Sequence, residues 1–155
     1  MITERLEALG IILPGPYPPH EPLDAVVIYN GIARTSGQLP RGLDGALVHP
    51  GTVGADVTVD QGAEAARWCA LNALSVLRAA LDDVGGLDAI ERVLTVLGFV
   101  ACERGFDRQA EVVDGASGVL FDVFGSAGRH SRSAVGVAAL PRGGAVEIEI
   151  AVTLR

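Results

Sequence analysis

The sequence contains no lysine: all twelve of its basic residues are arginine. Lysine forms Schiff bases, anchors pyridoxal phosphate and completes the Walker phosphate loop, so the chain cannot carry those chemistries. The basic residues are also outnumbered, 12 against 19 acidic residues, which gives a net charge of -7. Nucleic-acid binding normally leaves a basic footprint, so this charge argues against a nucleic-acid partner.

Cysteines and long apolar runs are scarce as well. The chain has two cysteines, Cys69 in an apolar helical pattern and Cys102 at the end of an apolar run. We expect both to be buried thiols in a reducing compartment, not a disulfide framework. The longest apolar run, from Val93 to Cys102, is interrupted by Thr95 and is far shorter than the ~18–20 residues of a membrane span. We therefore expect a cytoplasmic protein with no membrane partner.

The length of 155 residues predicts one domain, because domains hold roughly 100–200 residues. Aromatic residues are only 5% of the chain, so its core must be built from Val, Leu, Ile and Ala. Within this single domain, residues 1–22 form an N-terminal arm. We expect a short helix over residues 3–9 with Thr3 as N-cap, followed by an extended segment, Leu13–Pro22, that holds five prolines and lies on a surface.

The remaining pattern alternates strands and helices. The predicted elements are a hairpin of Ala25–Tyr29 and Ile32–Ser36 around Asn30-Gly31, a helix from an Asp60 N-cap to near Asp83, a strand Ile90–Val100 buried on both faces, a helix Gln109–Phe124 ended by Gly125, and a second hairpin of Ser133–Ala139 and Ala145–Leu154. Gly115 and Gly118 weaken the second helix and favour close packing. The sum is an α+β fold with two main helices on one face of a mixed sheet.

The familiar catalytic signatures are absent. Gly115-Ala116-Ser117-Gly118 has the wrong spacing for a nucleophile elbow and falls within a predicted helix. No strand leads into a G-x-G-x-x-G loop, and the three histidines form no metal-ligand pair, so we do not expect a metal site built from ligands close together in the sequence.

Three local features carry possible chemistry. Arg129–Ser133 is an arginine-dense loop that suits carboxylate recognition, although it also fits a solvated strand start. Glu147 and Glu149 share one strand face, which is either the wet side of the sheet or, if another subunit covers it, the place of an acid or base. The corner Thr35–Gln38 can present backbone N–H groups to a ligand or form a simple turn.

These features occur in stretches that resemble the RidA/YjgF family, often labelled endoribonuclease L-PSP. The stretches are T-S-G-Q-L-P at 35–40, R-S-A-V-G-V-A-A-L-P at 132–141 and V-E-I-E at 146–149, and the pattern of Gly128–Val137 resembles a longer-chain branch. The resemblance implies a chorismate-mutase-like fold and a homotrimer around a central barrel. It also implies hydrolysis of reactive 2-imino or 2-enamino acids to 2-oxo acids and ammonia, without a cofactor, in clefts between subunits.

The resemblance assigns roles to particular residues. It implies that Arg132 clamps the substrate carboxylate and that Glu147 positions water. Ser36 and Gly37 would line the cleft, as would Asp114, which stands near the family's asparagine. The backbone of Ser133 and Ala134 would contact the reacting nitrogen.

Three departures from the family pattern leave rival functions open, and the acidic Asp114 near the place of the family's asparagine is one of them. Leu23 stands near the place of the family's tyrosine, for which Tyr17 or Tyr29 could substitute, and Ala134 replaces a cysteine. One alternative is therefore a non-catalytic trimeric protein that binds small carboxylates such as 2-oxo acids. The remote alternative is an endoribonuclease.

Overall fold

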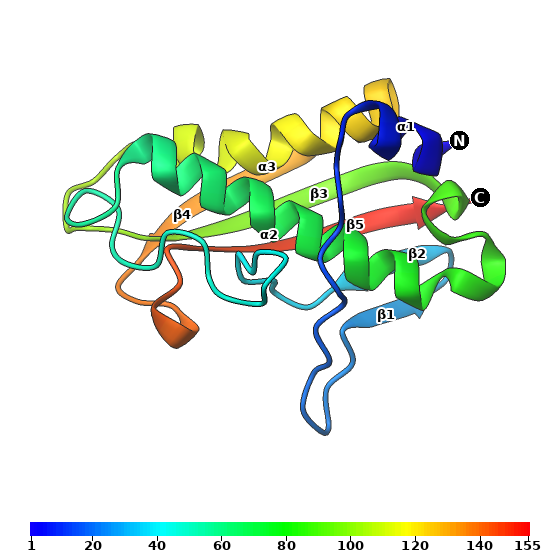
Figure 1. The fold of residues 1–155 in the computed structure, drawn as a ribbon, viewed down its shortest axis with the longest axis horizontal. Coiled ribbons are helices and arrows are strands. Elements are labelled where there is room, and N and C mark those ends of the chain that lie inside the picture. The colour runs from blue at the N-terminus through cyan, green and yellow to red at the C-terminus, as the bar shows by residue number, and fades with distance from the viewer.

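A computed structural model describes all 155 residues, as two layers (Figure 1). One layer is a five-stranded sheet, and the helices α2 (Val59–Ala80) and α3 (Gln109–Phe124) cover one of its faces. The short helix α1 (Ile2–Ala8) lies beside α3. Single 3-10 turns span Asp82–Val84, Gly86–Ala89, Gly125–Gly128 and Pro141–Gly143. The predicted α+β architecture with a mixed sheet is thus confirmed.

The sheet order is β1-β2-β5-β3-β4. The strands are β1 (Val26–Tyr29), β2 (Ile32–Thr35), β3 (Ile90–Ala101), β4 (Ser131–Val137) and β5 (Val146–Leu154). The pairs β1–β2, β2–β5 and β5–β3 are antiparallel, whereas β4 runs parallel to β3. As a result β4 forms one free edge of the sheet and β5 lies at its centre.

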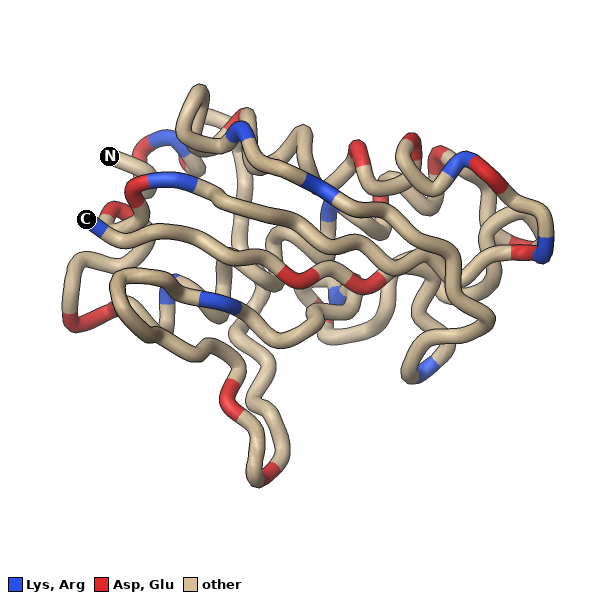
Figure 2. The backbone as a smooth tube through the Cα atoms, turned by 180° about the vertical axis from the view of Figure 1, so that it is seen from behind, with Lys and Arg blue, Asp and Glu red and all other residues tan.

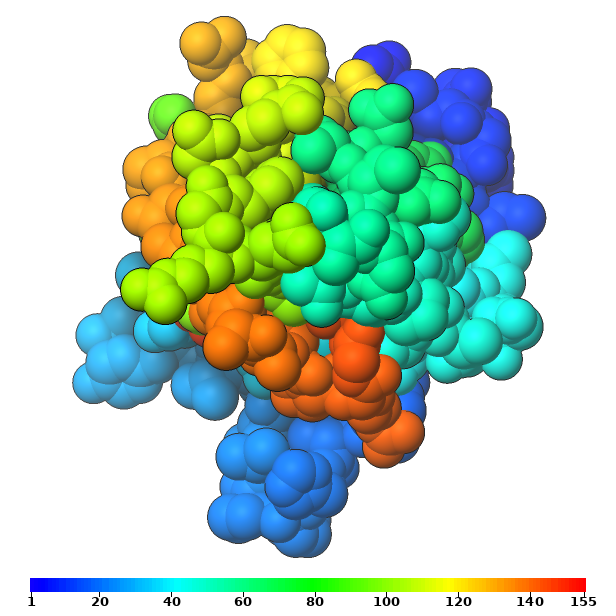
Figure 3. All heavy atoms as spheres, turned by 90° about the vertical axis from the view of Figure 1, so that its left-hand side faces the viewer, coloured from blue at the N-terminus to red at the C-terminus, as the bar shows by residue number.

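The second predicted hairpin is wrong. The stretches assigned to it do form β4 and β5, but β3 lies between them and pairs with both. The long apolar β3 forms backbone hydrogen bonds with a strand on each side. The chain after β4 must therefore pass around the end of β3 before it enters β5. Backbone bonds from Ala101 N to Ala145 O and from Cys102 N to Val137 O hold that crossing. Figure 3 looks onto this end of the molecule, where residues 102–108 lie beside the start of α2.

The first predicted hairpin is confirmed. β1 and β2 pair directly around Asn30 and Gly31, which have φ of 47° and 73°. Positive φ at both central residues is the requirement of a type I′ turn, and Asn-Gly meets it with the least strain.

The predicted helix starts need correction. Helix α2 is capped by Thr58, whose hydroxyl accepts from Gln61 N, while Gln61 Oε1 accepts from Thr58 N. This reciprocal pair is a capping box, and it places Asp60 in the first turn instead of at the cap. Thr3 likewise lies inside α1, which begins at Ile2.

The core lies between the sheet and the two long helices. On β5, Val146, Ile148, Ile150 and Val152 are buried against them, as the alternation predicts. The expected burial of β3 on both faces is not seen in the single chain, because the face away from the helices is uncovered and leaves Leu97 and Phe99 half-buried. Cys69 is fully buried, but Cys102 is only partly so.

The proline-rich arm is extended, as predicted. It crosses α2 before it projects beyond the sheet (Figure 1). The Ser75 hydroxyl donates to Pro14 O, and the guanidinium of Arg41 stacks 3.6 Å from the centre of the Tyr17 ring. None of the helices combines the length and apolarity that crossing a membrane would need.

The two long helices meet closely at Gly115. A Cβ built there would lie 1.9 Å from the carbonyl oxygen of Ala63 on α2, whereas a Cβ at Gly118 meets nothing within 4 Å. The close-packing role that the sequence offered to both glycines therefore belongs to Gly115.

This difference gives a paired stability test. We expect Gly115→Ala to lower the free energy of unfolding by about 1–3 kcal/mol, since overpacking must push the helices apart. Gly118→Ala should raise it by about 0.5–1 kcal/mol, the gain in helix propensity. Urea unfolding of both variants measures this, and equal effects would contradict the packing role of Gly115.

Candidate functional site

Arg132 lies on the edge strand β4 and points toward α3. Its Nη1 donates to Asp114 Oδ1 at 2.8 Å and to Ser117 Oγ at 3.1 Å, and its Nη2 donates to Ala110 O at 3.3 Å. Three acceptors on α3 therefore fix the plane of the guanidinium. Such a group can present remaining N–H bonds to a carboxylate without first losing much side-chain freedom.

The ion pair with Asp114 is uneven in exposure. The Arg132 side chain is 22% exposed, whereas that of Asp114 is 67% exposed. An exposed pair of this kind contributes only about 0–1 kcal/mol. Asp114 can therefore leave Arg132 at little cost when another anion arrives.

His130, which belongs to no sequence motif, completes this group. Ser117 Oγ lies 2.9 Å from His130 Nε2, and His130 Nδ1 lies 2.6 Å from Gly128 O. Ser117, His130 and Arg132 line a cavity of about 300 Å³ between α3 and β4. Motif spacing did not reveal Ser117 or His130, because their contact depends on how the loop returns from α3; the only signal was His130's place in the arginine-dense loop.

Glu147 lies on the opposite face of the sheet, at its centre. There Gln38 and Ile148 exchange two backbone hydrogen bonds, which hold the Ser36-Gly37 corner over β5. A Cβ on Gly37 would lie 2.7 Å from the Glu147 carboxyl carbon. The Gly37 backbone therefore lies directly against the Glu147 carboxylate, and a side chain at this corner would make the carboxylate move.

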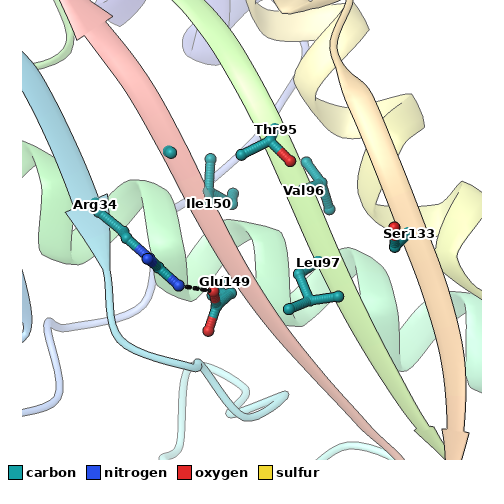
Figure 4. Close-up of a pocket in the computed structure, with 8 residues that line it drawn as sticks. Arg34, Thr95, Val96, Leu97, Ser133, Glu149 and Ile150 are labelled. Carbon is teal, nitrogen blue, oxygen red and sulfur yellow. Dashed lines mark hydrogen bonds and ion pairs between the residues drawn. The ribbon is translucent and has the colours of Figure 1, made fainter.

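The environment of Glu147 changes its acidity. Partial burial, and to a lesser extent the charge of Glu149, raise the pKa of Glu147 above the ordinary carboxyl value. Glu149 itself accepts a hydrogen bond from Arg34 of β2, and both border a cavity of about 290 Å³ on the uncovered face (Figure 4). The central pair of acidic residues on this face is visible in Figure 2.

The predicted site residues thus form two groups that do not meet within one chain. Arg132 opposes Val96 in the sheet and shares its helix-covered face, as does Ala134. Glu147 opposes Phe99 on the uncovered face, where Ser133 also lies and borders the Arg34–Glu149 cavity. The backbone of β4, between Ser133 and Ala134, separates the two faces.

Neither possible replacement for the family tyrosine stands beside Glu147. Tyr29 is level with the Thr153 end of β5, six residues from Glu147 or about 20 Å along the strand. Tyr17 is held by Arg41 and by a hydrogen bond from Arg142. Leu23, which stands near the place of the family tyrosine, is exposed.

The structure has no cluster of three or more His, Cys, Asp or Glu side chains that is placed to hold a metal ion.

The raised pKa of Glu147 predicts a pH-dependent stability. Its carboxyl holds a proton more tightly in the folded chain than in the unfolded chain, so the associated stability is present below about pH 4.3 and is lost as the pH rises through the folded pKa. We expect Glu147→Gln to melt higher than the wild type at pH 7, with the difference vanishing in acid.

Glu111 provides a control of opposite sign, because its hydrogen bond from Arg108 lowers its pKa. Stability linked to Glu111 is present at neutral pH and is lost as the pH falls. Thermal unfolding of Glu147→Gln and Glu111→Gln from pH 3 to pH 8 compares them, and a Glu147→Gln protein that melts below the wild type at pH 7 would contradict the assignment.

Known proteins are similar to this chain in sequence, and solved structures are similar to it in fold. Residues 4–148 match the family described as "YjgF/chorismate mutase-like, putative endoribonuclease". Protein TCP17 of Trypanosoma cruzi is 41% identical over 154 residues, covering 99% of this chain and 94% of its own.

Solved structures agree with the family match. A protein of unknown function from Agrobacterium tumefaciens has 39% identity and a TM-score of 0.88, over 99% of this chain and 91% of that one. A Shewanella oneidensis protein has 31% identity and a TM-score of 0.92, over 99% of both chains. Because the family match covers nearly the whole sequence, this chain belongs to the YjgF/chorismate-mutase-like family, which includes RidA.

Proposed function

We propose that the protein hydrolyses reactive 2-imino or 2-enamino acids to 2-oxo acids and ammonia, in clefts between the subunits of a homotrimer. Arg132 of one protomer clamps the substrate carboxylate, and Glu147 of the next positions the attacking water. The observation that carries the proposal is the placement of these residues, in matching family contexts, on opposite faces of one sheet.

The separation of the two groups supports assembly. A sheet with one uncovered face and a free β4 edge can place its edge against the uncovered face of a neighbour. Repeating that heterologous contact around a threefold axis closes a ring and makes three equivalent clefts. Half-buried Leu97 and Phe99 on the uncovered face supply apolar surface for such a contact.

The chemistry asks little of the protein. An imine carbon is already electrophilic and needs a held carboxylate, an oriented water and a route for protons. Arg132 provides the first through charge-assisted hydrogen bonds. Glu147, whose pKa is raised by burial, accepts the water proton as the C–O bond forms and returns it to the nitrogen that leaves as ammonia.

Backbone groups would take the place of the missing cysteine. Ala134 occupies its position, so only the main chain of Ser133 and Ala134 remains to contact the reacting nitrogen. Asp114 would move off Arg132 or share it when the substrate carboxylate binds, at the small cost expected for an exposed pair.

The same departures favour a second candidate function. Asp114 already neutralises Arg132 within the chain, and no tyrosine stands near Glu147. A trimer that binds a small 2-oxo acid without converting anything would fit these facts. It would bind the acid at the same cleft and release no ammonia from imines.

The direct test is hydrolysis of freshly generated 2-aminoacrylate. We expect Arg132→Ala to lower kcat/KM by about 100-fold, the loss of strong charge-assisted bonds. Glu147→Gln should lower kcat by about 10²–10⁴-fold, as for loss of a general base. Ammonia and 2-oxo acid release measure both. Arg78→Ala, on the outer end of α2, is the control and should keep the wild-type rate. Wild-type rates in Arg132→Ala would end the assignment.

The cleft between protomers has its own test, because each inactive variant keeps the half-site that the other lacks. Neither Arg132→Ala nor Glu147→Gln should be active alone. Co-refolded in equal amounts, they should recover about a quarter of the wild-type rate, the share of clefts that pair an intact Arg132 with an intact Glu147. A mixture as inactive as its parts, in trimers that native mass spectrometry shows to contain both variants, would place both groups in separate functions.

A further inference from the structure

Ser117 and His130 have the geometry of a nucleophile and its base. The Ser117 hydroxyl oxygen lies 2.9 Å from His130 Nε2. His130 Nδ1 lies 2.6 Å from the carbonyl oxygen of Gly128, which can only accept a hydrogen bond. In the neutral imidazole Nδ1 therefore carries the proton, and Nε2 is left to accept the proton of the serine hydroxyl.

Packing makes this arrangement rigid. Gly128 is pressed onto α3, where a Cβ would lie 2.2 Å from Leu120 O. The orienting carbonyl therefore cannot drift away from His130. It takes the place that a carboxylate occupies in other serine nucleophile sites, where the third group fixes the tautomer of the base.

Arg132 supplies the electrophilic group. Its Nη1 lies 3.1 Å from Ser117 Oγ, so the guanidinium is within reach of an oxygen that shares a carbon with Oγ. A cation held there stabilises the negative charge that develops on a carbonyl oxygen under attack. It also favours partial negative charge on Oγ as the proton leaves.

The cavity at this place favours an anionic substrate. It measures about 300 Å³, and its wall includes Arg129, whose side chain forms no ion pair or hydrogen bond in the structure. Phe121 adds an exposed apolar wall. An acyl group with a carboxylate a few bonds from its carbonyl would place that charge on Arg129 while the carbonyl oxygen meets Arg132.

We propose that Ser117 and His130 form an acyl-transfer site for small esters whose acyl group bears a carboxylate. The serine oxygen bonds to the carbonyl carbon as its proton passes to His130 Nε2. The bond from carbon to the leaving alkoxide then breaks, and His130 returns the proton to that alkoxide, giving an alcohol and an acyl-serine. Water next attacks the acyl carbon and gives its proton to His130, which returns it to Ser117 as the carboxylic acid leaves.

This activity goes beyond imine hydrolysis, although both use Arg132. It needs only one chain, because Ser117, His130 and Arg132 all lie between α3 and the strand β4 that follows it. It can therefore be present or absent whether or not the protein releases ammonia from imines.

The test uses the full-length protein and the mono-4-nitrophenyl ester of succinic acid as the probe. We expect a burst of one nitrophenolate per protomer and one succinyl group on the peptide that holds Ser117, seen by mass spectrometry. Ser117→Ala should show neither. His130→Gln should slow acylation by about 10²–10⁴-fold, as for loss of a general base. Ser117→Cys should recover the adduct as a thioester.

Ser131→Ala is the matched control, since Ser131 follows His130 directly at the start of β4 but its hydroxyl donates to Leu94 O of the neighbouring strand β3. It should react like the wild type. No adduct in the wild type would overturn the proposal, as would an adduct that persists in Ser117→Ala or is found on another residue. A burst that is equally fast in His130→Gln would also overturn it.

Discussion

The double pairing of β3 is the constraint on which the rest of the structure depends. Because β3 pairs with both β4 and β5, it forces β4 to the edge of the sheet and β5 to its centre. That order puts Arg132 against α3 at a free edge and Glu147 on the uncovered face two strands away.

The sequence predicted what depends on local pattern. Alternation in β5 placed Val146 and Ile148 inside and Glu147 outside, and Asn30-Gly31 identified the first hairpin through its need for positive φ. The sequence could not predict which strand pairs with which, because β3 is apolar along its length and could form backbone hydrogen bonds with either neighbour. The hairpin of β4 and β5 failed for that reason, since short connections favour neighbours in sequence and only the complete sheet shows that β3 enters between them.

The site was predictable residue by residue but not as an arrangement. The family resemblance selected Arg132, Glu147, Ser36 and Gly37, and the structure brings the last three together on one side of the sheet. It separates Arg132 from them. Ser117 and His130 were passed over because no motif spacing links residue 117 of a helix to residue 130 of a loop. Their contact follows from Gly125 and Gly128, which let the chain turn back tightly along α3.

Charge balance around Arg132 connects the two proposed chemistries. The same guanidinium nitrogen, Nη1, donates to an acid, Asp114, and to a neutral hydroxyl, Ser117. With Asp114 in place its net charge is offset, and it serves best as a hydrogen-bond donor to a carbonyl oxygen beside Ser117. With Asp114 displaced its full charge is available to a carboxylate. Asp114 is far more exposed than Arg132, so an incoming anion competes only with the weakly bound Asp114 for the well-oriented Arg132 guanidinium. The ligand therefore decides whether Asp114 stays paired with Arg132 or is displaced from it.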